Sequence, residues 1–228
     1  MSTASETLSD QGFVWFREAL SSDHLAEIES YCAFGKRPGR RLSDDPALLS
    51  LLSERSAMGE LIGAALPHAK PVRLVSFNKS QNANWAVPWH QDRVLAVREK
   101  HELPGYQNWT RQGDYWHVEP PEAVLQEMIF ARIHFDAATH ENGVMELASG
   151  THKLGKVAAE QARSVAEMKP ADVCEAAPGD VLLVKALTLH RSRSASKASQ
   201  RRALRVDYAA FDLPAPLQWA IGAAVGCG

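Results

Sequence analysis

The sequence has few cysteines. The three that occur, Cys32, Cys174 and Cys227, are an odd number, lie far apart in the chain and form no CxxC pair. This usage excludes a disulfide framework and a cysteine-rich zinc site. We therefore expect a reducing, cytoplasmic location.

Long apolar runs are also missing. The longest, 181–189 and 217–225, are much shorter than the ~20 residues that a membrane helix needs. The first ten residues are polar and acidic, unlike the basic and then apolar start of a signal peptide. We expect no membrane association.

Neither sign of charge is in excess, because 25 Lys+Arg stand against 27 Asp+Glu, for a net charge of -2. No overall field would attract nucleic acid, so we expect a small-molecule partner that is recognised by a defined site. The 228 residues and 45% hydrophobic content are enough for a well-buried core. Sandwiches and barrels of roughly 200–250 residues commonly form one domain, which predicts a single domain over 1–228.

The order of the apolar patterns predicts an α+β fold. A strand at 12–16 precedes a helix that Ser21, Ser22 or Asp23 would cap, and 46–66 has the spacing of one or two more helices. Strands dominate from Val72 onward. We expect a helical part over about 1–70 and a sheet-rich core over about 72–211, with helices on one face. The expected strands are 72–77, 86–97, 129–135, 144–147, 181–189 and 203–211.

The segment 98–121 is long for a connection. It holds Gly and Pro breaks and four aromatic residues, which favours a lid or a binding loop over a plain connector. Packing of those aromatics onto the core is the alternative.

The residues that indicate chemistry are Trp89-His90-Gln91-Asp92. Alternate side chains of a strand share a face, so His90 and Asp92 can hold one metal ion. The alternative is a histidine at a strand end that is hydrogen-bonded to a nearby acid. A second histidine would complete the two-imidazole, one-carboxylate set of non-haem Fe(II) oxygenases, which leaves metal positions open for a co-substrate and O2.

The best second histidine is His190, at the end of the apolar strand 181–189. The chain then folds back as a hairpin and brings a guanidinium, Arg201, near the metal, where it suits the remote carboxylate of a dicarboxylate. Ser192 can add a hydroxyl donor. Alternation in the last strand groups Arg202 with its apolar face, but helices outside the sheet also need an apolar face. We therefore favour Arg201 and keep Arg202 as the alternative.

Together these residues resemble the phytanoyl-CoA dioxygenase family of Fe(II)- and 2-oxoglutarate-dependent oxygenases. The resemblance covers roughly 72–208. It rests on Phe77-Asn78-Lys79, Val87 to Asp92, Glu141 to Glu146, Ser149 to His152, Pro178 to Val181, and His190-x-Ser192 with Arg201. It implies a double-stranded β-helix, or jelly-roll, barrel. Iron would be held by His90, Asp92 and His190, and 2-oxoglutarate by Arg201 with help from Ser192.

The resemblance implies hydroxylation of a small organic molecule, with succinate and CO2 as co-products. Because related halogenases lack the carboxylate, Asp92 favours hydroxylation over halogenation. Lys79 either touches 2-oxoglutarate or marks a solvated loop, and His117 and His134 are candidates to line the pocket. The alternatives are a non-catalytic jelly-roll protein that binds 2-oxoglutarate and metal, and a zinc hydrolase. An obvious general base beside His90 is missing for the hydrolase.

Overall fold

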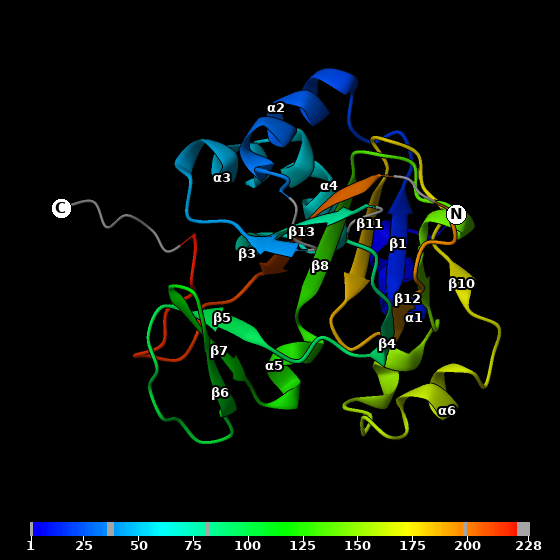
Figure 1. Ribbon diagram of the computed structural model, residues 1–228. Helices are drawn as coiled ribbons and strands as arrows, with labels where there is room; N and C mark the ends of the chain where they lie inside the picture. Colours follow the sequence, from blue (N-terminus) through cyan, green and yellow to red (C-terminus); the bar gives the residue numbers. More distant parts are fainter. Residues whose placement is uncertain (1, 36–38, 81–82, 198–199, 223–228) are drawn as a thin grey trace.

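The computed structural model of the protein describes residues 2–35, 39–80, 83–197 and 200–222. Its largest layer is an antiparallel sheet of six strands (Figure 1). In spatial order these are β1 (Phe13–Phe16), β11 (Val181–Lys185), β8 (Ile129–His134), β13 (Arg201–Ala209), β3 (Lys70–Lys79) and β2 (Gly39–Arg41).

A second sheet covers the inner face of the first. It consists of β10 (Asp172–Val173), β9 (Met145–Leu147), β12 (His190–Ser192) and β4 (Val87–His90). Apolar side chains of both sheets, among them Phe130, Leu182 and Met145, form one buried cluster between them. Within the described ranges no ladder joins the two sheets, so the jelly-roll prediction is confirmed as two facing sheets rather than as a closed barrel.

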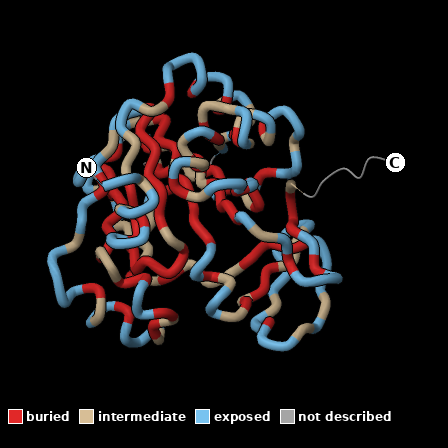
Figure 2. The backbone as a smooth tube through the Cα atoms, turned by 180° about the vertical axis from the view of Figure 1, so that it is seen from behind, coloured by how far each residue is buried: buried red, intermediate tan, exposed pale blue. Residues whose placement is uncertain are grey.

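The helices that were expected on one face are there. They are α1 (Ala4–Gln11), α2 (Ser22–Cys32), α3 (Pro46–Leu52) and α4 (Ala57–Ala65), and the last three lie together on one side of the large sheet (Figure 1). The side chains of Thr3, Ser21, Asp45 and Ser56 accept hydrogen bonds from the first turns of these helices. Beneath the helices lies the main core, and buried residues follow the central strands (Figure 2).

The strand β13 shows why the inner face of the large sheet, opposite the helical layer, carries charged residues. Leu204 and Val206 belong to the core beneath the helices. Alternation therefore turns Arg201, Ala203 and Arg205 to the inner face. Because the helices cover the apolar face of the sheet, the inner face is free to carry charged groups.

Two of the expected strands are wrong as single units. The segment 86–97 is divided between β4 and β5 (Leu95–Val97), which lie in different sheets. The segment 181–189 forms a strand only as far as Lys185, where β11 ends, and after a turn His190 begins β12 in the other sheet. Bonds between the two crossing segments replace a continuous ladder: the Asp92 amide donates to the Ala186 carbonyl at 3.0 Å. Strand alternation thus does not place Asp92 or His190. The hairpin expected between His190 and Arg201 is also wrong, since β12 and β13 lie in different sheets.

The segment 98–121 is not a long irregular loop. It contains β6 (Gln107–Gln112) and β7 (Tyr115–Glu119), which form a three-stranded sheet with β5. Trp109 packs edge-on against Trp116, with the ring centroids 6.4 Å apart. The alternative of aromatic packing is the one that the structure supports.

The remaining elements are short. The edge strand β2 directly follows residues 36–38, which lie outside the described residues. The short helices are α5 (Glu122–Gln126), α6 (Ala162–Ala166), η1 (His140–Asn142) and η2 (Thr151–Leu154). None of the helices in the described ranges combines the length and the apolar character that crossing a bilayer requires.

Truncation of Leu204, which is 0% exposed, tests the core beneath the helices. We expect Leu204→Ala to lower the free energy of unfolding by about 2–5 kcal/mol, because it removes buried contacts and leaves a cavity. Urea denaturation measures this, with Leu154→Ala, at a site that is 60% exposed, as the matched control within about 0.5 kcal/mol of the parent. Equal losses in the two variants would contradict the assigned core.

Candidate metal centre

His90, Asp92 and His190 meet at one point between the two large sheets. Each offers one potential ligand atom, and these atoms all lie within 4.8 Å of one another. His90 ends β4 and His190 begins β12, and the two residues are opposite each other in the ladder, with ring centroids 4.2 Å apart. Asp92 follows β4 in the crossing segment. The structure therefore brings together the three residues that the sequence singled out.

Both imidazoles are oriented in the same way. The Nδ1 atom of His90 lies 2.9 Å from the Pro88 carbonyl, and that of His190 lies 2.9 Å from the Thr188 carbonyl. A carbonyl can only accept, so each Nδ1 carries a hydrogen and each Nε2 is the ring nitrogen left to face the site. Burial lowers the pKa of His90, which favours the neutral ring. Neutral imidazoles with free Nε2 atoms are the form that binds metals.

An arginine holds the carboxylate of the group. Arg205 Nη1 donates to Asp92 Oδ2 at 2.8 Å, and His190 Nε2 lies 3.3 Å from the same oxygen. Burial alone would raise the pKa of Asp92, but Arg205 and then His190 bring it well below its usual value. Arg205 is itself held by Asp207 at 2.6 Å, and Asp207 also pairs with Arg73 at 3.3 Å. The carboxylate therefore stays ionised, at the end of a chain of ion pairs.

Gln91 fixes the crossing segment between His90 and Asp92. Its amide nitrogen donates to the carbonyls of Gly155 and Leu187 at 2.8 Å each, and its oxygen accepts from the amide of Val157 at 2.9 Å. Leu187 lies just before β12, so this side chain joins the two segments that carry the histidines.

Two neutral imidazoles and one carboxylate on one side of a site are the donor set of non-haem Fe(II) proteins. A tetrahedral structural zinc site would use four protein ligands. Across the part of the chain that the structure describes, this is the one group of three or more potential ligands. The chemistry of these donors fits a ferrous ion with coordination positions left open.

A cluster of cations lies on the inner face of the large sheet. Arg201 and Lys79 are opposite each other on β13 and β3, and Arg132 lies on the inner face of β8. Arg201 is 3% exposed, and its Nε and Nη1 atoms have no partner among the described residues. Within the same residues, none of the three forms an ion pair with a carboxylate. Such a cluster fits an anionic ligand with more than one charge.

Burial affects the pKa values of all three cations. It lowers the pKa of Arg201 to about 10, and together with Arg201 and Arg205 it lowers the pKa of Arg132 to about 9. Burial, Arg201 and Arg132 lower the pKa of Lys79 to about 7, and its Nζ donates to the Arg193 carbonyl at 2.6 Å. The arginines stay charged at neutral pH, while Lys79 titrates there. Lys79 is buried rather than part of a solvated loop.

The structure places Arg201 and Arg202 on opposite faces. The Arg202 guanidinium forms two hydrogen bonds of 2.8 Å with Asp136 and also pairs with Glu29 of α2. It is thus a link between the sheet and the helical layer. Ser192 lies two residues after His190 on β12, and its hydroxyl has no hydrogen bond among the described residues.

The other notable histidines have different settings. His134 lies on the inner face next to Trp15, with ring centroids 5.7 Å apart, and burial and Arg132 lower its pKa to about 3. His117 is buried on β7, and His152 Nε2 bonds the Ser9 carbonyl at 3.0 Å. The sequence did not single out Arg132 or Arg205. Charged residues at alternate positions of a buried strand were the signal that would have found Arg205.

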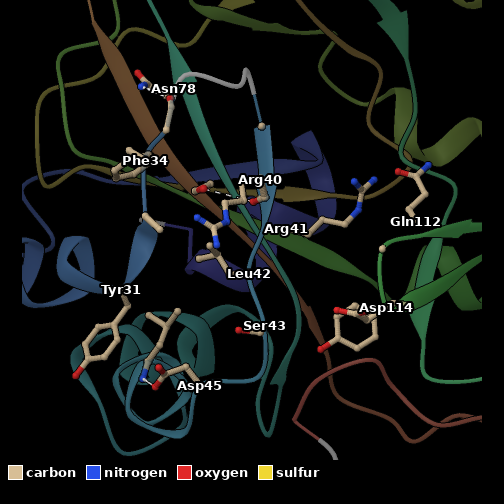
Figure 3. Close-up of a pocket in the computed structure, with 17 residues that line it drawn as sticks. Tyr31, Phe34, Arg40, Arg41, Leu42, Ser43, Asp45, Asn78, Gln112 and Asp114 are labelled. Atoms are coloured by element: carbon tan, nitrogen blue, oxygen red, sulfur yellow. Dashed lines mark hydrogen bonds between the residues drawn. The ribbon is translucent and has the colours of Figure 1, made fainter.

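A large cavity among the described residues does not contain the three converging residues. It has a volume of about 970 Å³ and lies between α2, α3, β2 and the turn that joins β6 to β7 (Figure 3). Ser76 and Asn78 line it from β3, on the side of that strand opposite Lys79. Arg41 lines it from the edge strand β2.

Comparisons with known proteins agree with this geometry. The family model for phytanoyl-CoA dioxygenase (PhyH) matches residues 9–203. No curated protein matches the chain.

Solved structures share the fold at low identity. EvdMO1 has a TM-score of 0.64 and 18% identity over 90% of this chain, which spans only 49% of that protein. AviO1 from Streptomyces viridochromogenes Tue57 has a TM-score of 0.62 and 18% identity, with 92% of this chain and 95% of AviO1 covered. HygX from Streptomyces hygroscopicus, solved with nickel and 2-oxoglutarate bound, has a TM-score of 0.58 and 15% identity, with 89% and 84% covered.

Structures of similar fold also include SnoN and SnoK from nogalamycin biosynthesis, which are described as an epimerase and a carbocyclase that depend on alpha ketoglutarate. The likeness to these structures shows the fold, and the family model covers most of the chain. The chain therefore belongs to the phytanoyl-CoA dioxygenase family.

Proposed function

We propose that the protein is an Fe(II)- and 2-oxoglutarate-dependent dioxygenase that hydroxylates a small organic molecule, with succinate and CO2 as co-products. The observation that supports this most is the convergence of two imidazole Nε2 atoms, each freed by an Nδ1 hydrogen bond, with an ionised carboxylate. His90, Asp92 and His190 would hold the iron. When bound, the iron and 2-oxoglutarate supply O2 activation and oxidative decarboxylation.

The chain's own residues would orient and charge this site. Arg205 keeps Asp92 ionised and fixes one of its oxygens, while the carbonyls of Pro88 and Thr188 fix the histidine rings. Phe130, whose ring centroid lies 5.5 Å from that of His190, lines the site with apolar surface and helps to exclude water.

Arg201 would bind the far carboxylate of 2-oxoglutarate. Its unpartnered guanidinium atoms match a carboxylate geometrically, and Ser192 and Lys79 would add donors. HygX, which has a similar fold, was solved with 2-oxoglutarate bound, and this supports 2-oxoglutarate as the ligand.

Hydroxylation is the finer part of the proposal. Similar structures include an epimerase and a carbocyclase, so the fold alone does not select one outcome. Asp92 would occupy the metal position that a halide would need, and hydroxylation is the simplest outcome that remains. The HygX structure with hygromycin B bound is consistent with a small-molecule substrate.

Cys32 and Cys174 are buried free thiols, which supports the proposed cytoplasmic location, and Cys227 lies outside the described residues.

The metal assignment is tested by binding. We expect His90→Ala or Asp92→Ala to abolish Ni(II)-dependent binding of 2-oxoglutarate in calorimetric titrations, because chelation needs the complete donor set. The exposed His140→Ala is the control that leaves binding unchanged. Tight metal-dependent binding in the His90 variant would refute the assignment. Binding without any succinate from a broad substrate panel would favour the non-catalytic alternative.

Variants of Arg201 and Arg202 form a matched pair that tests which of the two arginines binds 2-oxoglutarate. We expect Arg201→Gln to weaken 2-oxoglutarate binding at least about thirtyfold, because loss of one partner of a buried charge pair costs about 2 kcal/mol or more. Arg202→Gln should leave the affinity within about twofold and should instead reduce thermal stability, since Arg202 pairs with Asp136 and Glu29. The reverse ranking would transfer the role to Arg202.

The low pKa of Lys79, about 7, predicts a pH dependence of binding. Lys79 is charged below this pKa and neutral above it, and a bound carboxylate raises the pKa again. The 2-oxoglutarate affinity should therefore fall as pH rises above about 7, with net proton uptake on binding. Titrations in two buffers of different ionisation enthalpy measure the uptake. Lys79→Met should flatten the pH profile, and a profile as steep as that of the parent would rule out Lys79 as its source.

A further inference from the structure

We propose that Arg41, Arg73 and His117 form a subsite for an anionic group of the substrate, a carboxylate or a phosphate. This rests on the proposed function and narrows the substrate to a small organic acid or phosphate ester. The subsite lies at the β2 edge of the interior, away from the Arg201 cluster.

The register of the large sheet sets the position of this subsite. Arg41 on β2 is opposite Val75 on β3, and Val75 is opposite Arg205 on β13. Directly opposed residues share a face, so Arg41 and Arg205 both belong to the inner face. Two spacings between strands amount to about 10 Å. A group bound at Arg41 is therefore within the length of a small molecule from the arginine that holds Asp92.

The two arginines of β2 point to different sides. Figure 3 shows Arg41 extending from β2 toward the hairpin that carries Gln112 and Asp114, whereas Arg40 turns away from it. The Arg41 Nε atom donates to His117 Nε2 at 3.4 Å. In the described part of the chain, Arg41 has no carboxylate partner.

The hydrogen bond from Arg41 defines the state of His117. Because Nε2 accepts, the neutral ring must carry its hydrogen on Nδ1. Burial, Arg73 and Arg41 lower the pKa of His117 to about 4, so the ring is neutral near pH 7. His117 is 2% exposed, and its Nδ1 atom has no partner among the residues that the structure describes. A buried N–H donor is thus left without an acceptor.

Arg73 provides a second donor of this kind. Its Nη1 atom donates to Asp207 at 3.3 Å, but its Nε atom is buried without a partner in the described ranges. Asp207 is shared with Arg205, whose other partner, Asp92, is the proposed metal ligand. The guanidinium groups of Arg41, Arg73 and Arg205 thus outnumber the carboxylates near them, which are those of Asp207 and Asp92. An anionic group would satisfy both orphan donors and balance the remaining charge.

There is space beside these donors. Arg41, Arg73, His117 and Tyr115 line a small cavity of about 10 Å³, which is room for about one water molecule. Arg41 and Tyr115 also line the cavity of about 970 Å³, so the two spaces adjoin at these side chains. One oxygen of a carboxylate or phosphate would take the place of that water molecule beside the donors.

The test uses inorganic phosphate as the probe and Arg40→Gln as the matched control. Phosphate is titrated into the full-length protein loaded with Ni(II) and 2-oxoglutarate, which blocks the Arg201 cluster. We expect Arg41→Gln to weaken phosphate binding at least about tenfold, because a hydrogen bond to a charged group contributes about 1.5–3 kcal/mol. Arg40→Gln should stay within about twofold of the parent. His117→Phe, which keeps both arginines and removes the Nδ1 donor, should also weaken binding.

The same titrations on metal-free protein carrying Arg201→Gln separate this inference from the proposed function. That background needs neither metal nor 2-oxoglutarate, so phosphate binding that depends on Arg41 would be seen there even if the oxygenase assignment failed. Absence of phosphate binding in both backgrounds would overturn the subsite. Equal losses in Arg40→Gln and Arg41→Gln would overturn it too, since they would show general attraction to a basic edge.

Discussion

The ion pair between Arg205 and Asp92 connects the two halves of this molecule. Arg205 comes from the large sheet, whereas Asp92 follows a strand of the smaller one, and the two meet at 2.8 Å inside the fold. Loss of one partner from such a pair leaves an uncompensated charge in a poorly solvated place. The carboxylate that would bind metal is thus part of the contact that positions one sheet against the other.

This arrangement is possible because the helices take the apolar side of the large sheet. Leu204 and Val206 face the helical layer, and the alternate positions of β13 then carry Arg201, Arg205 and Asp207 into the interior. The interior charges separate into two groups. One surrounds Arg201 and suits a dicarboxylate co-substrate, and the other lies at the edge strand β2, where Arg41 approaches His117. Arg205, which holds Asp92, belongs to the same inner face as both groups.

Part of this could be predicted from the sequence and part could not. The order of helices before strands and the choice of Arg201 rather than Arg202 for the inner face depend on local patterns, and the structure agrees with both. The sequence also singled out His90, Asp92 and His190, which the structure brings together. The apolar runs at 86–97 and 181–189 gave no sign that the chain changes sheet within the first run and directly after the second. Those crossings are set by long-range bonds, such as the Gln91 amide on the Leu187 carbonyl. The convergence of the histidines and Asp92 therefore depends on these long-range bonds, which strand alternation cannot predict.

The central claim is that one ferrous ion sits between two sheets with 2-oxoglutarate bound toward β13. A crystal structure of the anaerobic protein with iron and 2-oxoglutarate, with anomalous data at the iron edge, tests this most directly. The account predicts a single iron peak bonded to His90 Nε2, His190 Nε2 and an Asp92 oxygen, with the far carboxylate of 2-oxoglutarate on Arg201. Iron at another place, or that carboxylate on Arg202, would contradict it.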